Sequence, residues 1–355
     1  MPSSPPPSPL QRAHRAPVTP FRRHAALSPA HHARLAARLT PRDRWLIAML
    51  HEHRVLTTHA IATMAFPSGR AARMRLLQLY QWDVIDRFQP LLRVGAAPMH
   101  YVLAGAGAAV LAAQAGVTLK QLGYRRDDAL ALAHHHTLAH TVAINDLFAR
   151  LVARSASGPV RLDTWWSETR CRRLIGDIVR PDAYGRVTLA RTHTGTHTGR
   201  RSGFEWFLEL DNATTTLATL AAKIDRYAEL AATTHTATPL LVRFPTPRRE
   251  TGAREHLARA LRALDNPALI PLATAATDGT DAGDAAWLPL DPTTGTRPPQ
   301  RLTLTDLATR WPAPPRGNPA LNHPAGLDER PELDAPTPIP PEPASYNPAA
   351  ATHHR

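Results

Sequence analysis

Carboxylates in the second half of the chain have the type and spacing of a metal site. Asp182 follows a proline at the end of an apolar run, and the segment 204–211 interleaves acidic with apolar side chains. Because side chains of a strand alternate between its faces, three acids fall on one face, namely Glu205, Glu209 and Asp211. Like charges so placed repel unless a divalent cation or a basic group lies near them. Asp182 and Glu209 are the oxygen ligands that Mg²⁺ prefers.

Lys223 stands out because the chain has 40 arginines and only two lysines. Where arginine is favoured so strongly, a lysine indicates a need for a compact ammonium group. It lies in a helix predicted at 215–232, directly after the acidic strand. The alternative interpretation, an ordinary surface lysine, fits the sequence equally well.

These side chains belong to a predicted mixed sheet flanked by helices. The helices are expected at 129–154, 215–232 and 254–264, and the strands at 160–166, 177–184, 204–211, 240–244 and 269–272. This order predicts an α/β domain (α+β for the whole chain) over residues 129–290.

A smaller module is expected before it, at residues 39–125. Thr40 followed by Pro41 predicts a helix start, because threonine caps the first turn and proline fits the first helical position. Further helices are predicted at 58–64 and 68–81, the last with Leu76, Leu77 and Leu79 inward, and strands at 84–88 and 100–103. Three short helices followed by a β-hairpin is the order of a winged helix-turn-helix, whose third helix enters the major groove of DNA.

The third of these helices carries arginines and no acid, which is typical of a DNA-contacting helix. Arg70 and Arg73 share a face, and Arg75 lies to one side, where it could reach the phosphate backbone. Arg87 and Arg93, from the predicted hairpin, are expected to support them. The alternative is the solvated face of a helical protein–protein module.

The charge of the chain favours a polyanionic partner. Its 355 residues carry a formal net charge of +13, and eleven of these charges fall within residues 1–128. Such one-sided basic excess is the electrostatic pattern of a nucleic-acid binder, although solubility in an arginine-rich proteome is an alternative. The proline-rich ends, 1–38 and 291–355, are predicted to be a disordered basic arm and a disordered tail.

Other features exclude whole classes of protein. No apolar run approaches the length of a membrane helix and no signal peptide is evident, so we expect a cytoplasmic protein. Cys171 is the single cysteine, which rules out internal disulfides and cysteine-rich zinc sites. His136 and His140 have the spacing of a metal pair on a helix, but no third ligand is evident, and chance explains the pair in a chain with 19 histidines.

Several short motifs resemble the replication-relaxation family of actinobacterial plasmids and integrative elements. They are Arg-Pro-Asp-Ala at Asp182, Phe-Leu-Glu-Leu-Asp-Asn at Glu209, Lys-Ile-Asp-Arg-Tyr from Lys223, and, in the first half, Leu-Thr-Pro-Arg-Asp and Arg-Met-Arg-Leu-Leu-Gln-Leu-Tyr. The resemblance covers about residues 39–275. It implies a protein that acts on double-stranded DNA in plasmid replication, DNA relaxation or transfer, with relaxase or replication proteins of the same element as partners and with no membrane or small-molecule cofactor.

The second half is also similar to the PD-(D/E)xK nuclease superfamily. This similarity implies that Asp182 and Glu209 bind Mg²⁺, that Glu168 is an additional upstream acid, and that a lysine orients the attacking water. Asp211 stands where the motif lysine belongs, and Lys223 could replace that lysine from the following helix, with Asp211 as a further ligand or as its partner. Two functions stay open: a metal-dependent DNA endonuclease or nickase, and a non-catalytic regulator or relaxosome accessory protein whose nuclease-like core is a scaffold.

Overall fold

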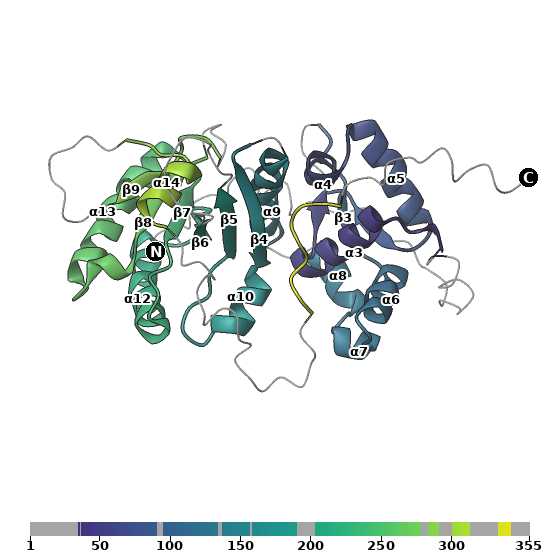
Figure 1. Cartoon of the computed structure of the whole chain (residues 1–355), viewed down its shortest axis with the longest axis horizontal. Coiled ribbons are helices and arrows are strands. Elements are labelled where there is room, and N and C mark those ends of the chain that lie inside the picture. Colours follow the sequence, from purple (N-terminus) through teal and green to yellow (C-terminus); the bar gives the residue numbers. More distant parts are fainter. Residues whose placement is uncertain are drawn as a thin grey trace, which may run out of the picture.

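The computed structural model describes residues 35, 37–90, 95–133, 137–156, 158–189, 203–277, 283–290, 300–312 and 333–341. The molecule is elongated, with the N-terminal helices at one end and the last strands of the larger sheet toward the other (Figure 1). Among the described residues, no helix combines the length and the apolarity that a membrane crossing requires.

The first half begins with helices that start at hydroxyl side chains. Each capping side chain accepts a hydrogen bond from a backbone N–H in the first turn of its helix. The pairs are Thr40 with α3 (Pro41–His53), Thr57 with α4 (Thr58–Ala65) and Ser68 with α5 (Gly69–Gln81). The helices predicted from Thr40, at 58–64 and at 68–81 are therefore confirmed.

A small antiparallel sheet follows these helices. β2 (Ile85–Phe88) pairs with β3 (His100–Leu103), as the sequence predicts, and β1 (Leu56–Thr57) adds to the other edge of β3. One expectation for α5 is wrong: Leu77 is 42% exposed, because it lies about 100° around the helix from the buried Leu76.

α9 (Leu138–Ser155) packs between the two halves of the molecule. It contacts α4 and β1 on one side and β4 on the other. The buried Asn145 side chain donates to the carbonyl oxygens of His53 and Val55, at 3.2 and 2.6 Å. Three further helices precede it along the chain: α6 (Gly105–Gln114), α7 (Leu119–Leu122) and α8 (Arg126–Leu132). One apolar core consequently runs from the N-terminal helices through α9 into the larger sheet.

The larger sheet is mixed and follows chain order. Its strands are β4 (Val160–Ser167), β5 (Ala183–Leu189), β6 (Gly203–Leu210), β7 (Leu240–Phe244), β8 (Leu272–Ala276) and β9 (Leu288–Leu290). The pairs β6–β7 and β7–β8 are parallel, and the other neighbours are antiparallel.

Helices cover both faces of this sheet. α9 and α14 (Leu304–Arg310) pack on one face, and α11 (Leu217–Ala221), α12 (Lys223–Thr234) and α13 (Pro247–Ala263) contribute to the core on the other. A short 3-10 helix, η1 (Pro267–Leu269), leads into β8. The mixed α/β fold that the sequence predicts, a mixed sheet flanked by helices, is thereby confirmed.

Two strand predictions are displaced. The strand expected at 177–184 begins only at Ala183, because α10 (Glu168–Ile175), which the sequence analysis missed, and the turn after it occupy the preceding residues. The strand expected at 269–272 is β8, which starts at Leu272 because η1 occupies the residues before it.

The tail predicted at 291–355 contains ordered structure. α14 forms there because Thr303 and Asp306 make a capping box and Leu304 and Leu307 share one buried face. Residues 333–341 lie against the body of the protein, where Trp45 and Arg170 bind their carbonyl groups. Of the arm predicted at 1–38, only Leu35 and residues 37–38 are among the described residues.

Candidate functional site

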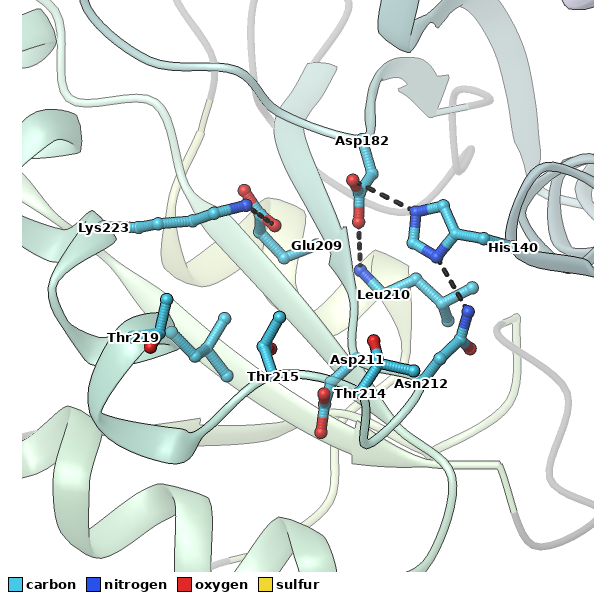
Figure 2. Close-up of a pocket in the computed structure, with 11 residues that line it drawn as sticks. His140, Asp182, Glu209, Leu210, Asp211, Asn212, Thr214, Thr215, Thr219 and Lys223 are labelled. Atoms are coloured by element: carbon cyan, nitrogen blue, oxygen red, sulfur yellow. Dashed lines mark hydrogen bonds and ion pairs between the residues drawn. The ribbon is translucent and has the colours of Figure 1, made fainter. Parts of the chain in front are cut away.

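Asp182, Glu209 and Lys223 converge at one end of the larger sheet (Figure 2). Asp182 immediately precedes β5, and two hydrogen bonds tie it to β6: its N–H donates to the Leu208 carbonyl at 3.1 Å, and the Leu210 N–H donates to its Oδ2 at 2.8 Å. Lys223, the first residue of α12, extends its Nζ to within 2.6 Å of Glu209 Oε2. These side chains line a cavity of about 150 Å³.

Glu209 is buried and carries two partners. Its side chain is only 4% exposed, and Tyr227 donates a hydrogen bond to its Oε1 at 2.7 Å. Burial, together with the nearby charge of Asp182, raises the pKa of Glu209 to about 7, although Lys223 and Tyr227 both lower it. Tyr227 belongs to the Lys-Ile-Asp-Arg-Tyr motif, and its contact with Glu209 was not predicted from the sequence.

His140 completes the site from α9. Its Nε2 lies 3.1 Å from Asp182 Oδ1, and its Nδ1 lies 2.9 Å from the side-chain amide nitrogen of Asn212. Burial lowers the pKa of His140, but the hydrogen bond and charge of Asp182 outweigh it, so the net shift is upward. Burial raises the pKa of Asp182, but His140, Lys223 and the Leu210 N–H together bring it below its usual value.

The possible metal pair of His136 and His140 does not account for the contact between His140 and Asp182. His136 lies outside the described residues, and His140 contacts a carboxylate and an amide. The position of His140 depends on how α9 packs against the sheet, which no local spacing in the sequence encodes. The sequence signal that could have indicated this role is a histidine at the third position of a helix that lies beside the acidic strand.

Asp211 lies at the same pocket but faces another partner. Its carboxylate accepts hydrogen bonds from Arg249 at 2.6 and 3.3 Å and from the Ala213 N–H at 3.0 Å. Ala213 has a φ of 58°, so Asp211 stabilises a left-handed turn after β6. Two roles were expected for Asp211, a further metal ligand or a partner of Lys223, and its carboxylate pairs with Arg249 instead of Lys223.

Glu168 stands beside Asp182 at the end of the neighbouring strand. It is the exposed first residue of α10, directly after Ser167, which pairs with Ala183 across β4 and β5. Its charge contributes to raising the pKa of both His140 and Lys223. The upstream acid implied by the nuclease resemblance therefore lies within electrostatic reach of the site.

Each of the three carboxylates that the sequence places on one face of the segment 204–211 is paired with a basic side chain. Lys223 pairs with Glu209, Arg249 with Asp211 and Arg186 with Glu205. Within the described residues, no group of three or more His, Cys, Asp or Glu side chains is arranged to hold a metal ion. Mg²⁺, however, is commonly held by one or two carboxylates, with waters and substrate phosphates as the other ligands.

The donor chemistry of Asp182 and Glu209 fits such an ion. Burial and then the charge of Asp182 raise the pKa of Glu209 even with Lys223 present, so a further cation at this position would favour the ionised carboxylate. An ion would compete with His140 and Lys223 for the carboxylate oxygens that these two side chains hold.

The arginines predicted to contact DNA differ in their surroundings. Arg70 and Arg73 are exposed on α5. Arg75 instead turns inward, where its Nε donates to the buried Asp43 at 2.9 Å and its guanidinium lies 5.0 Å from the Trp82 ring. Arg87 lies over the Tyr80 ring at 4.3 Å, and Arg93 is outside the described residues.

Comparison with known proteins gives one match. The sequence model of the family described as replication-relaxation matches residues 47–245, which span α9, the pocket and most of both halves. No curated protein and no solved structure matches the chain.

Proposed function

Because this chain belongs to the replication-relaxation family, which suggests a role in the replication or relaxation of plasmid or other element DNA, we propose that it binds duplex DNA through its first half and hydrolyses a phosphodiester bond at the Asp182 pocket. The single observation that carries the catalytic part is the convergence of Asp182, Glu209 and Lys223 in one cavity. Relaxase or replication proteins of the same element are its proposed partners.

DNA binding is supported by the exposed face of α5. Arg70 and Arg73 lie there without an acidic neighbour on the same helix, and α5 is followed by the β2–β3 hairpin in the order of a winged helix. Arginines that neutralise phosphates release counterions, which makes affinity depend on salt. Arg75 is assigned a structural role, since its guanidinium is committed to Asp43.

In the catalytic proposal, Asp182 and Glu209 hold Mg²⁺. A bound ion of this kind polarises the scissile phosphate and lowers the pKa of a bound water. Lys223 has a raised pKa, because Glu209 and Asp182 outweigh its burial, and is thus a cation at neutral pH. Its ammonium would stabilise negative charge that develops on the phosphate oxygens. Tyr227 and the Leu210 N–H hold the two carboxylates in place.

The test is plasmid nicking with Asp182→Asn beside a matched control, Asp225→Asn, at an exposed position of α12. Asp182→Asn should abolish Mg²⁺- or Mn²⁺-dependent nicking of supercoiled DNA and leave DNA affinity nearly unchanged, because the exposed arginines lie on α5. Asp225→Asn should nick as the parent does. Lys223→Ala should slow cleavage without abolishing the rise in melting temperature that the metal produces.

A specific observation favours a second function, that of a non-catalytic regulator or accessory protein. Every oxygen of Asp182 and Glu209 has a partner inside the protein, contributed by His140, Leu210, Lys223 and Tyr227. In this case the parent protein nicks neither supercoiled nor single-stranded DNA, and Mg²⁺ leaves its melting temperature unchanged. That pair of results would overturn the catalytic proposal while leaving DNA binding intact.

A further inference from the structure

A proline-rich segment near the C-terminal end of the chain lies between the two halves of the molecule. This segment, residues 333–341, runs between β4 and α3 in Figure 1. We call residues 333–341 the proline segment. Trp45 of α3 donates its indole N–H to the Thr337 carbonyl oxygen at 2.8 Å, and Arg170 of α10 donates to the Leu333 carbonyl oxygen at 2.9 Å.

The two donors are themselves held in place by the body of the protein. Arg170 is bound by the Glu52 carboxylate through its Nε, at 3.1 Å to each oxygen, and through its Nη2 at 2.8 Å. The Glu52 side chain is 5% exposed, and it also accepts hydrogen bonds from Ser167. Trp45 packs in the apolar core with Leu46. Arg170 is thus held by Glu52 independently of the proline segment, and Trp45 belongs to the core against which that segment packs.

The chemistry of the contact matches the chemistry of proline. Four of the nine residues in the proline segment are prolines without a backbone N–H, so carbonyl oxygens outnumber N–H groups among the backbone polar groups that a receptor must satisfy. Aromatic-lined grooves are the usual receptors for such a segment. Here two donors meet two carbonyls, Pro338 is buried, and Leu333 and Ile339 pack against the core.

We propose that Trp45 of α3 and Arg170 of α10 form a docking surface for an extended proline-rich peptide, and that this chain occupies the surface in cis with its own proline segment. Because one donor comes from each half of the molecule, the docked segment ties α3 to α10. The proposal does not depend on what the Asp182 pocket does.

The experiment uses the full chain with a specific protease site introduced within residues 313–332. After cleavage, the C-terminal fragment should co-elute with the body in size-exclusion chromatography at micromolar concentration. An excess of a synthetic peptide with the sequence of residues 331–343 should displace it, and a scrambled peptide should not. Immediate loss of the fragment from the cut parent protein would overturn the proposal.

Two variants locate the contact. Trp45→Phe keeps an aromatic ring and removes the N–H, so the fragment should dissociate roughly three to ten times faster. Trp82→Phe, at the end of α5, is the matched control and should leave release unchanged. Ile339→Ala alters only the segment, so it should speed release even if Trp45→Phe disturbs the body. Equal retention of the fragment by Ile339→Ala and the parent, or a dimer in which segments exchange, would contradict docking in cis.

Discussion

His53 offers a test of how the two halves of the molecule are joined. It is the last residue of α3 and is 2% exposed, and its ring stacks on Trp165 of β4 at 3.6 Å between centroids. In the part of the chain that the structure describes, neither ring nitrogen has a hydrogen-bond partner. Burial is the main reason that the pKa of His53 falls from 6.5 to about 4. The substitution to examine is His53→Phe.

The size of the effect follows from linkage. A fall in pKa from 6.5 to about 4 corresponds to about 3 kcal/mol, because each tenfold change in proton affinity is worth about 1.4 kcal/mol. Between these two pH values the unfolded chain binds a proton that the folded protein excludes. The free energy of unfolding therefore falls by about that amount as the pH drops from 6.5 to 4, through this residue alone. Phenylalanine keeps the stacking and removes the titration.

The measurement is urea unfolding of the parent and His53→Phe at pH 7.5, 5.5 and 4.5. The advantage of the variant should grow steadily as the pH falls, because all other titrating groups are common to both proteins and cancel in the difference. His59→Phe, at an exposed position of α4, controls for the exchange itself. A difference between parent and His53→Phe that stays constant across this range would refute the reasoning.

Three further predictions concern charged side chains. Burial raises the pKa of Glu52, but Arg170 outweighs it and brings the value to about 2. The stability that this pair contributes is thus present above pH 4.5 and is lost as the pH falls toward 2. Glu52→Gln should therefore lower the free energy of unfolding at pH 7 by about 3 kcal/mol. In urea titrations, the variant should also show a weaker dependence of this free energy on acid pH. Arg75→Ala should lower the melting temperature, because it strands the buried Asp43, and leave the salt dependence of DNA binding unchanged. Arg73→Ala should leave the melting temperature unchanged and should reduce the slope of log affinity against log salt by about 0.9.

The elements that position the candidate site were predictable because local pattern determines them. The alternation in 204–211 marks β6, where Phe204, Trp206 and Leu208 do face one core and Glu209 the other side. The order of strands and helices then brings Asp182, before β5, beside it. What the sequence could not show is which cation each carboxylate would receive, since Arg249 is 38 residues from Asp211 along the chain.

Contacts between distant segments account for what was missed. Arg75 and Asp43 are 32 residues apart, and only the hydrogen bond between them in the folded protein shows that this arginine has an internal partner. The proline segment has the composition of a disordered chain. Its docking depends on Trp45 and Arg170, which belong to two other helices and are brought together only by the fold.

The packing of α9 makes the two halves interdependent at the site. The module boundary predicted near residue 125 falls before α9, but α9 packs on α4 while its Phe148 stacks between Trp165 and Trp206 of the larger sheet. The same helix carries His140 to Asp182. Cutting the chain at this boundary would expose the face of α9 that α4 covers and remove support from the helix that places His140. The geometry of the Asp182 pocket is therefore a property of both halves together.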